Sequence, residues 1–112
     1  SAMLTRLGFR TDTAANGEEA VKIVQHNHQG YDLILMDCQM PVMDGYEATR
    51  RIREWERSNG QHGIPIIALT ADVLPTTESI CLGSGMSDFL TKPVRKEKLQ
   101  EVLGRWTPLR EE

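Results

Sequence analysis

Residues 31–37 (YDLILMD) and the following residues 38–45 (CQMPVMDG) form the most informative stretch of the sequence. The apolar run is nearly uninterrupted, which is typical of a strand covered on both faces in a parallel sheet. The run ends in a carboxylate, Asp37, and open α/β sheets bind their ligands at the carboxyl ends of strands. We therefore interpret Asp37 as the residue around which the chain is organised.

The composition indicates one globular domain. The chain has 112 residues, of which 39% are hydrophobic and 26% charged, as expected for a domain with a core. The net charge is −3 without a basic block, so nucleic acid is not expected as a direct partner. No apolar run approaches the roughly 20 residues that span a bilayer. Cys38 and Cys81 lack metal-ligand spacing, and we expect both to be reduced, as in a cytosolic protein.

Elsewhere, strand and helix patterns alternate. Residues 3–9 look like the last turns of a helix closed by Gly8. Asn16 with Glu19, and Asp44 with Glu47, are capping pairs that predict two helix starts. The other predicted elements are strands at 10–14, 64–70 and 88–91, a short helix from Pro75 to about 82, and a last helix at 95–106. The alternation predicts an α/β fold with a parallel sheet.

Several nearby residues have structural interpretations. His26 and His28 mark a solvated helix end, because no third metal ligand is in view, and His62 lies in a polar loop. Met40 and Met43 are expected to pack. Cys38 is expected to be a small buried group.

The strand ends predict a shared site. Right-handed crossovers place the ends of parallel strands at one edge of a sheet, so Asp37, Thr70 and Lys92 should converge there. A carboxylate can act as a nucleophile and form an aspartyl-phosphate. An ammonium group neutralises the charge of phosphoryl oxygens, and a hydroxyl group can donate a hydrogen bond to a further phosphoryl oxygen. This combination suits phosphoryl transfer, usually with Mg²⁺.

The sequence resembles the receiver domains of two-component response regulators, especially those of hybrid sensor histidine kinases. The resemblance covers essentially all of residues 1–112 and is carried by four motifs: 16–20 (NGEEA), 36–50 (MDCQMPVMDGYEATR), 66–71 (IIALTA) and 89–93 (FLTKP). It implies a flavodoxin-like fold, a three-layer α/β/α sandwich with strand order 2-1-3-4-5, of which a single-domain receiver is a well-known example. Output would run through the face built by residues 75–106.

The resemblance also implies residue roles. Asp37 would accept a phosphoryl group from a phosphohistidine on a histidine kinase or a histidine phosphotransfer domain. Thr70 would bond the phosphoryl oxygen, and Lys92 would pair with the phosphoryl group next to a cis Lys92–Pro93 peptide. Phe89 would be a switch residue that moves with Thr70. The backbone carbonyl of Gln39 would bind Mg²⁺ beside Asp37. The domain would be cytoplasmic, as part of a membrane-bound sensor kinase or otherwise.

One part of the family pattern is missing. The family's first strand ends in an acidic pair that helps to hold Mg²⁺, and neither occurs in residues 1–112. Asp12 cannot replace the pair, because it lies within the 10–14 strand. We therefore expect an amino-terminally truncated receiver with an incomplete Mg²⁺ site, weak phosphorylation and a gap in the sheet. Because open edges recruit strands, the 10–14 strand would shift beside 31–37, or two chains would pair or exchange strands.

Two other functions compete with a phosphoacceptor domain that is not itself an enzyme. A degenerate receiver would bind partners without phosphorylation, an alternative that the missing acids favour and the intact Asp37, Thr70 and Lys92 oppose. A phosphatase of the haloacid dehalogenase type also uses an Asp nucleophile, but it needs a general acid two residues later. Gln39 occupies that position and cannot exchange a proton.

Overall fold

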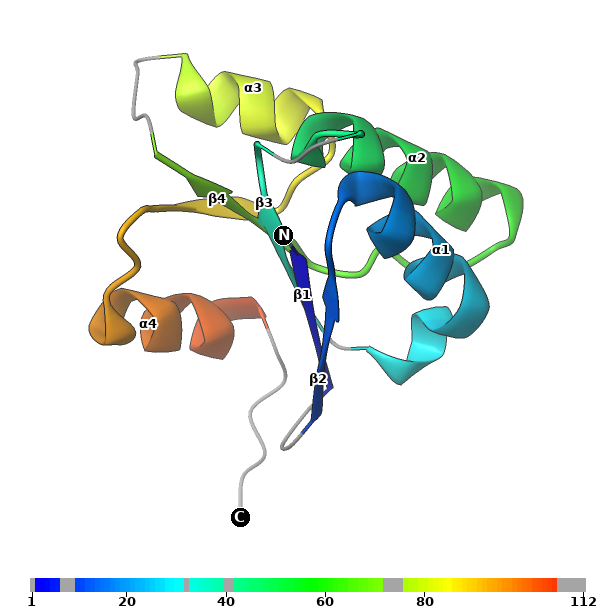
Figure 1. The fold of residues 1–112 in the computed structure, drawn as a ribbon, viewed down its shortest axis with the longest axis horizontal. Coiled ribbons are helices and arrows are strands. Elements are labelled where there is room, and N and C mark those ends of the chain that lie inside the picture. Colours follow the sequence, from blue (N-terminus) through cyan, green and yellow to red (C-terminus); the bar gives the residue numbers. More distant parts are fainter. Residues whose placement is uncertain (1, 7–9, 32, 40–41, 72–75, 107–112) are drawn as a thin grey trace.

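The computed structural model describes residues 2–6, 10–31, 33–39, 42–71 and 76–106. It shows five strands in one sheet, in the order β2-β1-β3-β4-β5 (Figure 1). The strands are β1 (Ala2–Arg6), β2 (Arg10–Ala14), β3 (Leu33–Asp37), β4 (Ile66–Thr70) and β5 (Asp88–Thr91). The predictions made for Gly8, Met40 and Pro75 lie outside the described residues.

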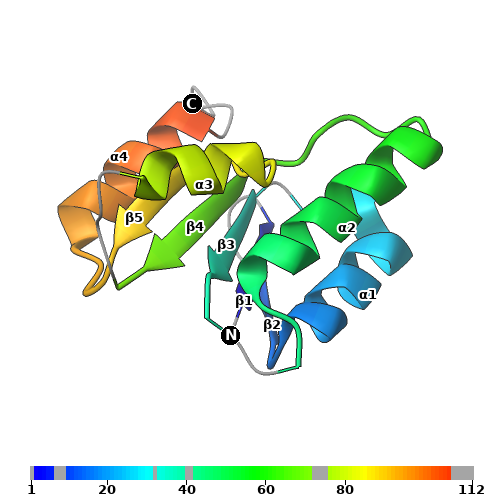
Figure 2. The same ribbon diagram turned by 90° about the horizontal axis from the view of Figure 1, so that it is seen from above.

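Helices cover both faces of this sheet (Figure 2). One face carries α1 (Gly17–Asn27), the 3₁₀ turn η1 (His28–Gly30), α2 (Gly45–Ser58) and α3 (Thr77–Gly83), and the other carries α4 (Lys96–Trp106). Both capping predictions are confirmed: Asn16 Oδ1 accepts from the Glu19 N–H at 2.9 Å, and Asp44 Oδ1 accepts from the Glu47 N–H at 2.9 Å. The predicted flavodoxin-like three-layer class is confirmed.

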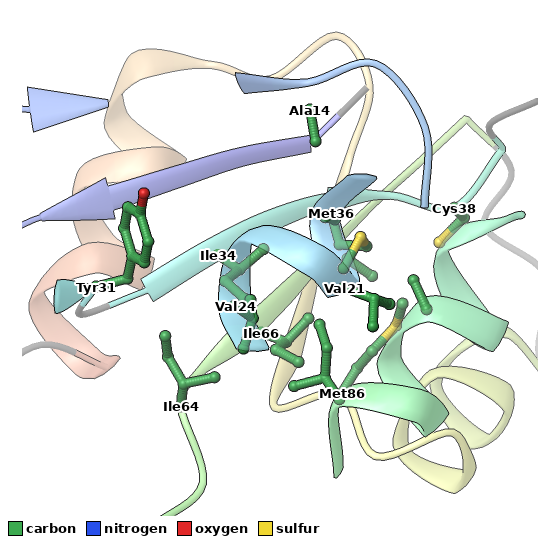
Figure 3. Close-up of a cluster of buried hydrophobic side chains, with 14 of the residues drawn as sticks. Ala14, Val21, Val24, Tyr31, Ile34, Met36, Cys38, Ile64, Ile66 and Met86 are labelled. Carbon is green, nitrogen blue, oxygen red and sulfur yellow. The ribbon is translucent and has the colours of Figure 1, made fainter. Parts of the chain in front are cut away.

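Strand β3 separates two apolar cores. Along β3, Leu33 and Leu35 face α4, while Ile34 and Met36 face α1 and α2. Figure 3 shows Ile34 and Met36 close to side chains of α1 in the larger cluster. Since all four side chains are buried, the apolar run is explained by burial on both faces. Asp37, the last residue of β3, is the first residue of this run to reach the edge of the sheet where β3 ends.

The prediction of a helix over residues 3–9 is wrong for its described part. Residues Ala2–Arg6 form β1, which lies between β2 and β3 and is antiparallel to both. A place in the middle of a sheet offers backbone hydrogen bonds on two sides, and such tertiary context overrides a short helical pattern. The sheet is therefore mixed, with only β3, β4 and β5 mutually parallel.

The expected gap in the sheet is also absent. Strand β1 pairs Leu4 with Asp12 of β2 and with Ile34 of β3, so the place beside β3 is filled from within the chain. The expected shift of the 10–14 strand is therefore contradicted. Strand exchange between two chains through a gap loses its structural basis for the same reason.

A further correction concerns His28, which is buried rather than solvated. Only 4% of His28 is exposed, and its Nε2 lies 2.7 Å from Glu56 Oε2 of α2. Because a carboxylate only accepts, Nε2 donates this hydrogen bond. The 3₁₀ turn that follows α1 carries His28 inward, so it pairs with a helix from a later part of the chain. His26 is exposed, as predicted.

Candidate functional site

The predicted site residues lie at the rim formed by the carboxyl ends of the parallel strands. Asp37 is the last residue of β3, Thr70 is the last residue of β4, and Lys92 follows directly after β5. The parallel registers pair Asp37 with Leu69, and Thr70 with Thr91. Three segments that are distant in sequence thus end at the same level.

Asp37 and Lys92 are in direct contact. Lys92 Nζ donates to Asp37 Oδ2 at 2.8 Å, with the two side chains 38% and 18% exposed. The other carboxylate oxygen, Oδ1, accepts from the Gln39 N–H at 3.0 Å. The carboxylate is therefore held from two sides and remains partly open to solvent, which a small reactant or a docking partner requires.

These contacts keep Asp37 ionised. Burial disfavours the charged carboxylate and by itself raises its pKa, but the Lys92 hydrogen bond, the Gln39 N–H and the attraction of the Lys92 charge together hold the pKa of Asp37 below its ordinary value. At neutral pH, Asp37 is consequently an anion with its oxygens fixed in place. An ionised, oriented carboxylate is what a nucleophilic role needs.

Thr70 is hydrogen-bonded to the backbone of Lys92, and Phe89 lies on β5, the strand that leads to Lys92. Thr70 is 7% exposed, and its backbone carbonyl accepts from the Lys92 N–H at 2.8 Å, which fixes the start of the Lys92 segment. Phe89 is partly buried against the larger core cluster. The peptide between Lys92 and Pro93 is cis, as the resemblance implied.

The loop that leaves Asp37 is held by a close backbone approach. The Gly45 N–H donates to the Cys38 carbonyl at 3.1 Å. A Cβ at Gly45 would lie 2.4 Å from the carbonyl oxygen of Asp37, so no side chain fits at this position. The start of α2 is thereby packed directly against the backbone of Asp37.

Asp37 is a described side chain at this rim whose chemistry suits Mg²⁺. Mg²⁺ binds in proteins through one or two carboxylates and keeps several waters. Asp37 offers one carboxylate, and the carbonyl of Gln39 is near it in sequence. No cluster of three His, Cys, Asp or Glu side chains suited to a metal occurs in the described part of the chain. Within the described residues, Asp37 is therefore not part of a larger group of metal-binding side chains.

Cys38 is buried, as predicted, and it contacts two further groups. Its side chain interacts with those of Tyr46 and Cys81, and burial is the main reason why the pKa of the Cys38 thiol is raised. A neutral buried thiol is a poor nucleophile. The contact with Cys81 of α3 could not be predicted from the sequence, since it depends on how α3 packs.

Several known proteins are similar to this chain in sequence. The model of the response regulator receiver domain family matches residues 1–104. Sensor protein GacS of Pseudomonas syringae pv. syringae is 42% identical over 107 residues, 96% of this chain. The two-component response regulator ORR41 of Oryza sativa subsp. japonica is 46% identical over 99 residues, 88% of this chain and 74% of that protein. The chain spans only 12% of GacS and 6% of hybrid signal transduction histidine kinase L of Dictyostelium discoideum.

Solved structures agree with these matches. The co-crystal structure of the Saccharomyces cerevisiae histidine phosphotransfer protein Ypd1 and the receiver domain of Ssk1 gives a TM-score of 0.79 and 39% identity, covering 86% of this chain and 70% of that one. The receiver domain of sensor histidine kinase PA1611 from Pseudomonas aeruginosa PAO1 was solved with magnesium in its active site cleft. It gives a TM-score of 0.72 and 47% identity, covering 89% of this chain and 78% of that one. No described helix is long and apolar enough to cross a membrane.

Proposed function

Because the chain belongs to the response regulator receiver domain family, we propose that it is the phosphoacceptor domain of a two-component phosphorelay, with Asp37 as the acceptor. The observation that carries this proposal is the 2.8 Å contact between Lys92 Nζ and Asp37 Oδ2 at the rim of the parallel strands. It joins an ionised nucleophile to a cation from a distant part of the chain. Residues 1–112 act as one receiver domain in this proposal.

The reaction is transfer of a phosphoryl group from a phosphohistidine nitrogen to a carboxylate oxygen of Asp37. The P–N bond breaks, a P–O bond forms, and the histidine leaves with the electron pair of the broken bond. Lys92 already lies at one carboxylate oxygen, so its charge is in place to neutralise the incoming phosphoryl oxygens. Thr70 supplies a hydroxyl to a further oxygen, and Phe89 follows the movement of Thr70.

The proposed partner is a histidine kinase or a histidine phosphotransfer domain. Support comes from a similar receiver, that of Ssk1, which was solved with the phosphotransfer protein Ypd1. Similarity to hybrid signal transduction histidine kinase L of Dictyostelium discoideum supports a place within a hybrid sensor histidine kinase, in the cytoplasm. The chain itself acts as a phosphoacceptor and not as an independent enzyme.

Mg²⁺ is the proposed cofactor, and when bound it supplies positive charge to the phosphoryl oxygens. Two similar receivers, those of PA1611 and of CKI1 from Arabidopsis thaliana, were solved with Mg²⁺. Asp37 and the Gln39 carbonyl would contribute to holding the ion here. They form only part of a donor set, so further oxygen ligands must complete it.

The test is phosphorylation by a small phosphodonor. The chain is incubated with phosphoramidate and Mg²⁺, and its intact mass is measured beside that of Asp37→Asn, which keeps the shape but removes the nucleophile. We expect a gain of one phosphoryl group in the wild type and none in the variant. A gain in both proteins would show that another residue reacts.

An interaction module is the second candidate function, and it is favoured by the lack of a group of three metal-binding side chains among the described residues. In that case the chain would bind a phosphotransfer protein such as Ypd1 while staying unmodified. Unchanged mass in the wild type, together with equal binding of Ypd1 by the wild type and Asp37→Asn, would support this alternative over the phosphoacceptor.

A further inference from the structure

The first turn of α1 touches the loop that joins β3 to α2. The Gly17 N–H donates to the Met43 carbonyl oxygen at 3.0 Å. A Cβ built on Gly17 would lie 2.3 Å from that oxygen, 3.0 Å from the carbonyl carbon and 3.1 Å from Ala48 Cβ. Two of these three neighbours are backbone atoms, which cannot rotate away as a flexible side chain would.

Helix formation alone does not account for a glycine here. Gly17 is the first residue of α1, and the helix is already capped by Asn16. By helix propensity, alanine would be preferred over glycine. What glycine uniquely allows at Gly17 is the close approach to Met43, and the residue is buried in that contact.

Met43 is linked to Asp37 by a short series of contacts. Met43 directly precedes Asp44, whose side chain caps α2, and Gly45, whose N–H donates to the Cys38 carbonyl at 3.1 Å. Gln39, the residue after Cys38, donates its own N–H to Asp37 Oδ1 at 3.0 Å. A displacement of Met43 therefore reaches the turn that orients the Asp37 carboxylate.

We propose that Gly17 is a positioning residue of the phosphoacceptor site: its missing side chain lets α1 hold the Met43 carbonyl and so fix the Gln39–Asp37 turn. Gly17 does not touch the reacting atoms. This role rests on the proposed function of Asp37. It means that the site also depends on the position of α1, which contributes none of the residues Asp37, Thr70 and Lys92. It predicts that filling the space at Gly17 slows phosphorylation more than it weakens the fold.

The test is Gly17→Ala, with two measurements. The first is the initial rate of Asp37 phosphorylation by phosphoramidate at saturating Mg²⁺, and the second is the backbone amide chemical shifts of Gln39 and Gly45. We expect displaced amide shifts and a rate lower by roughly tenfold or more, since a misplacement of about 1 Å can reduce a rate by about 10²-fold.

Two control variants separate positioning from stability. Gly104→Ala adds the same methyl group to α4, where nothing lies within 4 Å of the new Cβ, and it should change neither measurement. Val102→Ala removes buried volume on the α4 face of the sheet, and it should lower the unfolding midpoint without changing the rate. A wild-type rate and unshifted Gln39 amide in Gly17→Ala would overturn the proposal, as would an equal rate loss in Val102→Ala at matched stability.

A second pair of variants serves if Gly17→Ala fails to fold. Asn16→Ala removes the cap and loosens the start of α1 without adding a Cβ at Gly17, and Asn16→Asp keeps a capping oxygen. We expect a smaller rate loss and displaced Gln39 and Gly45 amides in Asn16→Ala, with both restored in Asn16→Asp. Wild-type behaviour in Asn16→Ala would contradict the proposal.

Failure of the two proposals can be told apart. If the wild type takes up no phosphoryl group, the role of Asp37 as acceptor fails. The amide shifts of Gln39 and Gly45 in Gly17→Ala still report whether α1 positions the turn.

Discussion

At the scale of single residues, the pair of Lys92 and Asp37 combines two opposing effects. Burial penalises the carboxylate charge, whereas the ammonium and the Gln39 N–H favour it, and the second effect is the larger. The pair is partly exposed, so its contribution to stability is about 1 kcal/mol or less. The main effect of the pair is therefore to keep the Asp37 carboxylate charged and oriented, and its effect on the stability of the fold is small.

Replacing the lysine tests this balance. In Lys92→Met, the carboxylate keeps its burial but loses its cation, so we expect the pKa of Asp37 to rise. The carboxyl ¹³C shift of Asp37 followed against pH measures this directly. Lys98→Met on α4 removes a lysine whose contact is with Glu101, and it should leave the Asp37 titration unchanged. An unchanged titration in Lys92→Met would contradict the assigned cause.

The same pair fixes the sign of a pH effect on stability. Since the pKa of Asp37 is lowered by folding, its contribution is fully present above the unfolded value of about 3.9. It is lost as the pH falls through the lowered folded pKa. The stability difference between wild type and Lys92→Met should therefore shrink on acidification.

At the scale of elements, the carboxyl-terminal half of α2 is tied to its neighbours by Glu56. This carboxylate is 3% exposed and accepts from His28 Nε2 at 2.7 Å, from the Ile64 N–H at 2.9 Å and from Arg53 at 2.9 Å. Arg53 in turn donates to the Gly85 carbonyl at 2.8 Å. One buried carboxylate thus links η1, α2 and the segment that enters β4, at the opposite end of the strands from Asp37.

Neutralising this carboxylate is expected to destabilise the fold. In Glu56→Gln the amide cannot serve all three donors, and breaking a buried ion pair by removing one partner costs about 3–5 kcal/mol. Urea unfolding measures the change. Glu47→Gln, on the exposed side of the same helix and paired with Arg50 and Arg51, is the matched control and should unfold like the wild type. Similar midpoints for the two variants would mean that the Glu56 contacts contribute little.

At the scale of the whole molecule, the position of β1 decides the character of the sheet. An antiparallel strand stands where the flavodoxin-like order has a parallel one, yet it leaves β3, β4 and β5 parallel. The rim that carries Asp37, Thr70 and Lys92 is therefore intact. The architecture of the site depends on the three parallel strands and tolerates a reversed neighbour.

Amide hydrogen exchange tests this sheet. Because β1 has partners on both sides, we expect the amides of Met3, Leu4 and Thr5 to exchange slowly, whereas β2, at the edge, should have alternate amides that exchange fast. Strand-like Cα shifts over Ala2–Arg6 should accompany the protection. Helical Cα shifts over the same residues would instead support the helix that the sequence pattern suggests.

Local signals and topology could be predicted from the sequence, whereas long-range contacts could not. Asn16 and Asp44 cap helices because a capping residue needs only its next few neighbours. The meeting of Asp37 with Lys92 followed from parallel strands sharing one edge. By contrast, His28 finds Glu56, and Gly17 finds Met43, only after helices have packed, and no nearby residue indicates either contact. The helix prediction for the β1 segment was wrong for a related reason, because pairing with two neighbouring strands outweighed the helical pattern of its sequence.

The antiparallel pairing of β1 with β2 also has a kinetic consequence. Its residue pairs, from Ala2 with Ala14 to Arg6 with Arg10, are close in sequence, whereas β3 must find β4 across the whole of α2. Hairpins form in about 1–10 μs, and contacts between distant segments form later because a larger loop must close first. The amino-terminal hairpin is therefore available as an early template, against which β3 can dock before the rest of the sheet assembles.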